Sequence, residues 1–449
     1  MSQIKTRRGL NIRLQGAAIC EIIMQDKSPE IFAIHPSDFQ GLISKPAIQP
    51  GDKIQRGEAV CFDKNNPEIR LVSPVSGILT DIVRGEKRKI LQYLITPDGT
   101  NAAVKLQAPE ENCSSEDAWE FLSVSGFAPY IMQRPYGVIA IPGTISDDIF
   151  ISFFDTAPLA PDYEFIFGES GATILKGFKL LSKITRGKIH AAFKQGSRLA
   201  EEFKSLSFIE LHYVSGPHPA GNTGTVINKV RPINKGDLIF TIQPSDVYAL
   251  GKTIETGEYY SQRIIALTGS EAQRPAYYST IQGASLKNIL SNNVASENVR
   301  VISGNVLTGS ICGETPFLSM THSQVTVIPE GKKFEMLGWI MPGFSKFSNS
   351  RTYFSWLFTK KQYRIDTNLK GGVRNYVMTG EYEKVCPLDI YPQHLIKSII
   401  VKDIDKMEQL GIYEVIEEDL ALCEFVCTSK TEVQAILREG LDMMRKEMN

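Results

Sequence analysis

Gly137-Val138-Ile139-Ala140-Ile141 opens a stretch in which strand and helix patterns alternate as far as Tyr213. Within it, Ile174, Phe178 and Leu181 recur at helical spacing, so residues 171–184 are predicted to form a helix with one apolar face. The other predicted elements are strands at residues 165–167, 188–193 and 208–213 and a short helix at 198–204. Alternating strands and helices predict a parallel sheet covered by helices, of Rossmann-like type.

Short strands joined by glycine turns are predicted upstream, over residues 45–95. Residues 50–58 and 73–85 place glycines where tight hairpins need positive φ. This pair of motifs resembles the barrel-sandwich hammerhead of biotinyl and lipoyl carrier domains, which attach their group to a lysine at a hairpin tip. The Asp63-Lys64 pair is followed by Asn65-Asn66-Pro67, which does not match such a tip. We therefore expect a structural domain and not a swinging arm.

The remaining chain divides into further modules, because 449 residues exceed what one hydrophobic core usually holds. Residues 224–228 and 233–237 echo the glycine spacing of the hammerhead. Residues 262–327 contain four strand candidates and one helix near 285–290, which suits a β-grasp module. Two C-terminal helices are predicted, one that begins at the acidic residues 417–419 and one over residues 431–448. The predicted fold class is mixed, multi-domain α/β. The predicted domains are a barrel-sandwich at 1–110 completed in part by 214–255, a Rossmann-like domain at 111–255, a β-grasp (SLBB-like) domain at 256–330 and a mostly helical domain at 331–449.

The composition argues against several functional classes. Lys plus Arg number 49 against 50 Asp plus Glu, a net charge of −1, which does not indicate a nucleic-acid binder. Seven scattered cysteines predict free thiols in a reducing compartment. No apolar run reaches the roughly 18 residues that span a bilayer. Arg13 and Gln15 interrupt the apolar run that an export signal would need, and Glu21 follows it at once. We expect a cytoplasmic chain that reaches a membrane through partner chains.

Three features could carry chemistry, and none matches a known motif. The loop Gly216-Pro217-His218-Pro219-Ala220-Gly221-Asn222-Thr223-Gly224-Thr225 follows a predicted strand, as a phosphate loop does, but its prolines remove donors and no convincing helix follows. Cys423 and Cys427 lack the tight cysteine run of an iron–sulfur cluster, so small core residues are the better interpretation. The six histidines show no metal spacing. We predict no metal site and no self-contained catalytic site.

Longer sequence strings resemble one family over nearly the whole chain: the A subunit (NqrA) of the bacterial Na⁺-translocating NADH:quinone oxidoreductase. The strings lie at residues 5–10, 62–67, 84–88, 216–221, 301–309, 338–343, 382–390 and 417–427. The family is similar in architecture to the flavin- and NADH-binding subunit of respiratory complex I and to the C subunit of the Rnf complex. The Gly-rich flavin loop and the cysteine run of those relatives are missing here.

The resemblance implies a scaffold without a cofactor of its own, in a translocase that reduces quinone with NADH and exports Na⁺. NADH, flavins and iron centres would then belong to other subunits. The expected partners are those subunits, especially the membrane-embedded B subunit, on the inner face of the membrane, and quinone is a further candidate ligand. Two alternatives stay open: a flavin- and NADH-binding subunit of complex-I type, and an assembly scaffold without quinone contact.

Candidate quinone or docking residues come from two places in the sequence. His218, Gly221 and Gly224 belong to the Gly- and Pro-rich loop, and Tyr353, Phe354 and Trp356 belong to an aromatic stretch near the C-terminal domain. A quinone site needs apolar and aromatic surface. The aromatic stretch, which also includes Phe358, fits an ordinary core or a docking face equally well.

Overall fold

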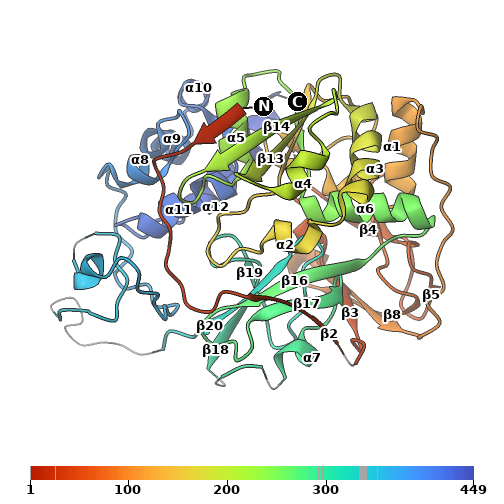
Figure 1. Cartoon of the computed structure of the whole chain (residues 1–449), viewed down its shortest axis with the longest axis horizontal. Helices are drawn as coiled ribbons and strands as arrows, with labels where there is room; N and C mark the ends of the chain where they lie inside the picture. Colours follow the sequence, from red (N-terminus) through yellow and green to blue (C-terminus); the bar gives the residue numbers. More distant parts are fainter. Residues whose placement is uncertain are drawn as a thin grey trace.

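The computed structural model describes residues 2–25, 27–291, 293–295, 298–332, 341–350 and 352–448. These residues form four β-sheets and a set of C-terminal helices, so the predicted mixed, multi-domain α/β class is confirmed. Figure 1 shows the helices α1, α3 and α6 on one side of the largest sheet and the C-terminal helices on the other. The β-grasp sheet lies across the far end of the molecule from this sheet.

The largest sheet has seven strands, and five of them are parallel. Its order is β1 (Ser2–Lys5), β14 (Ile209–Ser215), β13 (Ile189–Lys194), β12 (Asp148–Ser152), β15 (Ile239–Thr241), β10 (Met132–Arg134) and β11 (Val138–Ile139). Strand β10 runs antiparallel to both of its neighbours. This is the α-covered parallel sheet that residues 136–213 predicted, extended by one strand from the N-terminus.

Both faces of this sheet are buried, as is usual for parallel strands. Ile149 and Ile151 of β12 belong to the core that includes α1 (Ser115–Val124), α3 (Gly171–Leu181) and α6 (Pro244–Thr256). Phe150, between them, belongs to the core that includes α5 (Thr223–Val230) and the C-terminal helices. Because side chains alternate along a strand, one short strand joins two hydrophobic cores.

Three local predictions for this region were wrong. Residues 165–167 belong to helix α2 (Tyr163–Phe167) and not to a strand, because the Asp162 carboxylate accepts hydrogen bonds from the N–H groups of Glu164 and Phe165 and caps the helix. The central strand β12 was missed. Residues 224–228, expected to echo the hammerhead, form helix α5 instead, so a helix does follow the Gly- and Pro-rich loop. Helix α4 (Arg198–Glu202) lies where it was predicted.

The barrel-sandwich consists of two small sheets. One contains β3 (Phe32–Ile34), β9 (Ile90–Pro97), β8 (Gly77–Arg84) and β5 (Lys53–Ile54), and the other β4 (Ser44–Pro46), β6 (Ala59–Asp63) and β7 (Arg70–Val72). The Asp63 carboxylate accepts hydrogen bonds from the N–H groups of Ile43, Asn65 and Asn66. These bonds fix the turn after Asp63, while Lys64 is exposed.

The β-grasp sheet has the order β19 (Ser310–Ile311), β18 (Val299–Ser303), β20 (Gln324–Pro329), β16 (Gln262–Thr268), β17 (Ala276–Ile281) and β2 (Ile19–Met24), with helix α7 (Lys287–Leu290). The predicted helix near 285–290 is confirmed. Strand β2 comes from the N-terminal segment and pairs parallel with β17. The first 24 residues therefore add one strand to each of two distant sheets.

Among the described residues of the C-terminal region, the α-helices begin at residue 381. Its helices are α8 (Glu381–Val385), α9 (Pro392–Ile400), α10 (Ile404–Gln409), α11 (Glu417–Val426) and α12 (Val433–Met448), so the two predicted C-terminal helices are confirmed. Residues 341–350 and 352–380 are mostly irregular, with a 3₁₀ turn at Phe354–Leu357. Cys423 and Cys427 are buried, as expected for core residues. Residues 338–340 of the string 338–343 lie outside the described residues, and the predicted domain boundaries stay a prediction.

Candidate functional site

A cavity of about 280 Å³ lies at the carboxyl edge of the parallel strands, where the seven-stranded sheet, the β-grasp module and α11 meet. Ligands of open α/β sheets bind outside this edge, because the loops that follow the strands diverge there. The lining residues from the sheet loops are Ser152, Asp155, Ala157, Pro161, Tyr163, His218, Gly221, Asn222, Thr223 and Gln243. The β-grasp module contributes Gly304, Asn305, Leu307, Thr308, Thr321, His322, Ser323 and Gln324, and α11 contributes Glu418.

The Gly- and Pro-rich loop forms one wall of the cavity and is tied to the end of β12. Ser152 Oγ donates a 2.7 Å hydrogen bond to the carbonyl of Gly221, whose N–H donates to Thr156 Oγ1 at 2.9 Å. A Cβ on Gly221 would lie 2.0 Å from the carbonyl oxygen of Phe154, so a side chain cannot fit there. Close backbone packing therefore requires glycine at this position.

His218 is buried in the same wall, and its ring is neutral at physiological pH. Burial lowers the pKa of His218 to about 4. Its Nδ1 atom lies 3.3 Å from Thr156 Oγ1, and its backbone N–H donates to Asn11 Oδ1 at 2.9 Å. The N-terminal segment after β1 thus supports the loop from behind.

Glu418 gives the cavity a carboxyl group that titrates near neutrality. Burial and the charge of Asp419 raise the pKa of Glu418 to about 7, although Arg134 opposes the shift. Arg134 is 1% exposed and donates to Asp419 Oδ2 at 2.6 Å and to Glu418 Oε1 at 2.9 Å. Burial also raises the pKa of Asp155. At neutral pH the cavity can therefore hold a proton on a carboxyl group and exchange it.

The structure separates the predicted candidate residues. His218 and Gly221 line the cavity. Gly224 does not, because it lies under α11, where an added Cβ would be 2.2 Å from Asp419 Oδ1. Tyr353, Phe354 and Trp356 lie in the irregular C-terminal segment, away from the cavity lining.

Several cavity residues were not identified from the sequence. Asp155 follows β12, and recognising that strand would have placed Asp155 at a carboxyl edge. The acidic start of α11 was assigned to the helix dipole, which suits Asp419, whose carboxylate accepts a hydrogen bond from the Ile416 N–H at 3.0 Å. Its neighbour Glu418 faces the cavity instead. His322 Nδ1 lies 3.0 Å from Ser303 Oγ in the β-grasp module. No pattern in the sequence indicates that His322 lies near the seven-stranded sheet.

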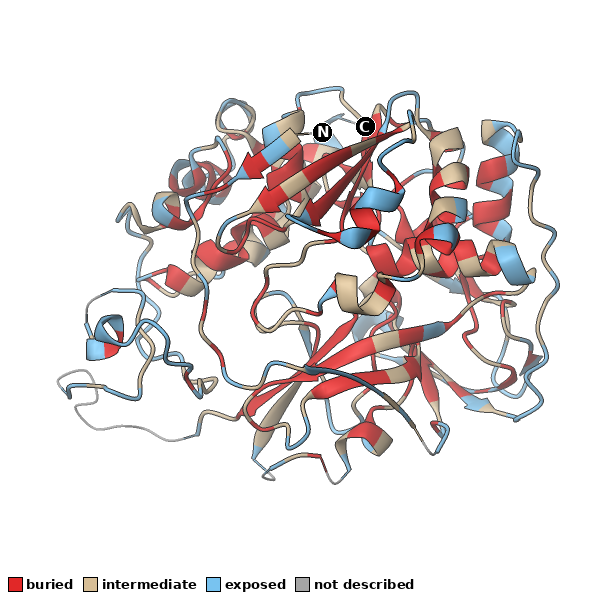
Figure 2. Ribbon diagram, viewed as in Figure 1, coloured by how far each residue is buried: buried red, intermediate tan, exposed pale blue. Residues whose placement is uncertain are grey.

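The irregular C-terminal segment exposes large apolar side chains. We call the following six residues the aromatic surface: Met341, Phe344, Phe354, Trp356, Leu357 and Phe358, which are 44–60% exposed. Figure 2 shows that this segment is mostly exposed and that it projects from the body of the molecule. The ring centroids of Phe344 and Phe354 lie 5.4 Å apart. The Arg13 guanidinium donates to the carbonyl of Ser355 at 3.3 Å, and this bond attaches the aromatic surface to the N-terminal part of the chain. The core interpretation is therefore wrong for Phe354, Trp356 and Phe358.

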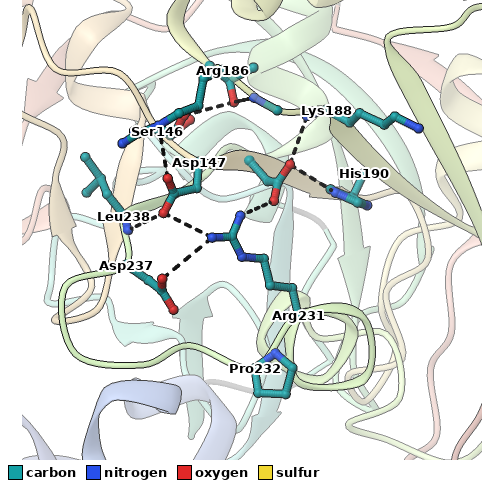
Figure 3. Close-up of polar contacts among 12 residues, drawn as sticks. Ser146, Asp147, Arg186, Lys188, His190, Arg231, Pro232, Asp237 and Leu238 are labelled. Atoms are coloured by element: carbon teal, nitrogen blue, oxygen red, sulfur yellow. Dashed lines mark hydrogen bonds and ion pairs between the residues drawn. The ribbon is translucent and has the colours of Figure 1, made fainter.

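The amino edge of the same sheet contains a network of opposite charges (Figure 3). Arg231, after α5, donates to Asp148 Oδ2 at 2.6 Å and lies 3.3 Å from Asp147 and 3.6 Å from Asp237. Burial opposes the charge of Asp148, yet hydrogen bonds from His190, the Lys188 N–H and Arg231 lower its pKa to about 2. The network joins α5 to β12 and β13.

Family models match three parts of the chain. The NqrA N-terminal barrel-sandwich hybrid domain matches residues 4–98, the NqrA second alpha/beta domain residues 113–259, and the NQRA C-terminal domain residues 264–314. Among the residues that the structure describes, none of the helices combines the length and the apolar composition of a membrane span.

Curated relatives match over their full length. The A subunit of the Na(+)-translocating NADH-quinone reductase of Yersinia pestis bv. Antiqua (strain Angola) is 34% identical over 448 residues, covering 99% of this chain and 100% of that protein. The proteins of the same name from Neisseria meningitidis serogroup A and Vibrio atlanticus are each 35% identical, with the same two coverages. This chain belongs to the NqrA family, the A subunits of the Na(+)-translocating NADH-quinone reductase, an oxidoreductase complex of several subunits.

Proposed function

We propose that the chain docks on the membrane subunits of its complex, especially the B subunit, on the cytoplasmic side, and forms part of the quinone-reduction end. It does so without a cofactor of its own, and NADH is oxidised on another subunit. The observation that carries the proposal is the cavity at the carboxyl edge, whose mostly polar lining would face the polar head group of a quinone and in which Glu418 has a pKa of about 7.

Quinone reduction explains why such a carboxyl group would be useful. A quinone takes up two electrons and two protons to become a quinol, so its site needs groups that transfer protons near neutral pH. Electrons would come from the other subunits. Glu418 would donate one proton to a quinone oxygen, and Asp155, whose pKa is also raised by burial, is the candidate for the second.

The aromatic surface supports docking through an apolar contact. Six large apolar side chains gathered in one irregular segment form the kind of patch that marks an interaction site. A protein partner with an apolar face, such as the exposed part of a membrane subunit, would cover it. Aromatic residues and methionine are enriched in such interfaces.

The first test separates quinone reduction from NADH oxidation in membranes that contain the whole complex. Glu418→Gln should lower NADH-to-quinone turnover at least about 10-fold, because general acid catalysis typically contributes about 10²–10⁴-fold. NADH-to-ferricyanide activity should persist. Glu417→Gln is the matched control, because Glu417 is the preceding residue of α11, pairs with Arg438 and does not line the cavity. Unchanged quinone turnover in Glu418→Gln would contradict the proposal.

The second test concerns docking. Met341→Ser combined with Leu357→Ser, both more than half exposed, should reduce recovery of the chain with the membrane subunits, while the free energy of unfolding changes by less than about 1 kcal/mol, at roughly 0.5 kcal/mol for each surface site. Ile19→Ser, at an exposed apolar position of β2, is the control. Full recovery of the double variant with the complex would refute this docking face.

The two alternatives make different predictions for the purified chain. A flavin- and NADH-binding subunit of complex-I type would show flavin absorbance in a visible spectrum. An assembly scaffold would support complex formation while Glu418→Gln and a quinone titration had no effect. The proposed function predicts a colourless chain and a quinone effect that Glu418→Gln alters.

A further inference from the structure

Three potential metal ligands meet on one face of the seven-stranded sheet, close to the charge network of the amino edge. His190 lies on β13, and Glu210 and His212 lie on β14. In the parallel register His190 is opposite Glu210, and Glu210 and His212 are two residues apart, so all three side chains project from the same face. Their ligand atoms all lie within 4.8 Å of one another.

The ligand set and the spacing suit zinc. Two imidazole nitrogens and one carboxylate oxygen form a zinc ligand set that leaves a fourth position for water. His190 Nδ1 and His212 Nε2 are 2.9 Å apart and hydrogen-bonded. Around a tetrahedral zinc ion two ring nitrogens would stand about 3.3 Å apart, given Zn–N bonds of about 2.0–2.1 Å. The rings need to separate by only a few tenths of an ångström.

The outer ring nitrogens already have the partners that metal-bound histidines use. His190 Nε2 lies 3.4 Å from Asp148 Oδ1, and His212 Nδ1 lies 2.6 Å from Ser2 Oγ. The Asp148 carboxylate in turn accepts hydrogen bonds from the Lys188 N–H at 2.8 Å and from Arg231. Figure 3 shows the side chains of His190 and Arg231 pointing toward the same carboxylate from different elements. A carboxylate behind a metal-bound histidine orients the ring and strengthens it as a ligand.

We propose that His190, Glu210 and His212 bind a zinc-class divalent cation. A proton on His190 Nε2, facing Asp148, leaves His190 Nδ1 to accept from His212 Nε2. On cation binding His212 would release that Nε2 proton and take up one on Nδ1, which then donates to Ser2 Oγ, so the ring stays neutral. Glu210 leaves its contact with Lys188, whose Nζ is 3.7 Å away, and becomes the third ligand. The side chains of Glu210 and Lys188 are 35% and 54% exposed, which gives the cation a path from solvent.

The role of the cation would be to fasten the N-terminal strand. Ser2 opens β1, the edge strand that pairs with β14, and the Ser2–His212 contact would tie it to the bound cation. This role is independent of quinone reduction, so the two proposals fail separately. No spacing motif reveals the site, because His190 and His212 are 22 residues apart and meet only through strand pairing.

Zinc binding to the full-length, metal-stripped chain tests the proposal. Titration calorimetry and dialysis with elemental analysis should find one zinc ion per chain, and zinc should raise the melting temperature. His190→Gln and Glu210→Gln should each weaken zinc binding by at least about 10-fold, as loss of supporting residues alone often does. Circular dichroism verifies that the variants are folded. Because Glu210 is partly exposed, Glu210→Gln stays informative if His190→Gln does not fold.

Two control variants address adventitious binding. His394→Gln removes an exposed histidine outside the cluster, and Cys20→Ser removes the exposed cysteine. Both should bind zinc as the parent does. Absence of stoichiometric binding by the parent, equal binding by Glu210→Gln, or loss of binding in Cys20→Ser would overturn the proposal.

Discussion

At the carboxyl and amino edges of the seven-stranded sheet, the pKa values of two acidic residues are shifted in opposite directions. At the amino edge, Asp148 has Arg231, His190 and a backbone N–H as partners, and its pKa falls to about 2. At the carboxyl edge, Glu418 shares a single buried Arg134 with Asp419, and its pKa rises to about 7. At the amino edge the contacts of Asp148 stabilise its charged form. At the carboxyl edge the surroundings of Glu418 favour its neutral form. The difference lies in the hydrogen bonds that Asp148 accepts and in the burial and neighbouring Asp419 charge that Glu418 meets, and it separates a structural site from one that can exchange protons.

The largest effect on this contrast is expected from removing Arg134. Arg134→Met leaves the carboxylates of Glu418 and Asp419 without their cationic partner, so we expect a loss of about 3–5 kcal/mol in the free energy of unfolding, measured in urea at pH 7. Arg438→Met, which removes a more exposed arginine paired with Glu417, should cost far less. A small loss for Arg134→Met would show that the cavity carboxyls do not need it.

A smaller effect is expected at the amino edge, from Asp148. Its folded pKa of about 2 lies below the ordinary value of 3.8, so its contribution to stability is present above pH 4 and is lost as pH falls toward 2. The shift corresponds to about 2 kcal/mol. Asp148→Asn should remove this part of the pH dependence, measured as the difference in unfolding free energy between parent and variant from pH 6 to pH 2.5. Parallel curves for the two proteins would contradict the network.

The smallest effect, of opposite sign, is expected from Glu418. Its folded pKa of about 7 lies above the ordinary value of 4.5, so the neutral form is favoured in the folded chain and stability declines as pH rises from 4.5 through 7. Since its side chain is 33% exposed, solvent screening reduces the effect to on the order of 1 kcal/mol. Glu418→Gln should flatten the decline, and Glu417→Gln should leave it unchanged. Urea unfolding at pH 5, 6, 7 and 8 measures both slopes, and equal slopes in the parent and Glu418→Gln would remove the difference between the two edges.

Long periodic stretches were predicted well, and short buried ones were not. Residues 171–184 have a clear apolar face, and the structure has α3 and a 3₁₀ turn there. Strand β12 was missed because five buried residues that begin with a charged aspartate have no alternation that a pattern can detect. Residues 165–167 were predicted to form a buried strand, but the side chain of Asp162 caps a helix there.

The candidate site was predicted only in part, for the same reason. His218 and Gly221 were candidates because they share one unusual loop, and both line the cavity. The β-grasp and α11 residues that complete the lining are distant in sequence from that loop. The aromatic stretch was visible in the sequence, but its exposure followed only from its position outside both large cores.

The mixed α/β class, the family and the helices with strong periodicity could be read from the amino-acid order, because these properties depend on neighbouring residues along the chain. Which charges are compensated depends instead on the packing of distant segments. Arg134 and Asp419 are 285 residues apart, and Asp148 and Arg231 are 83 apart. Burial and the distance between charges determine a pKa, and both arise only when such segments pack against each other.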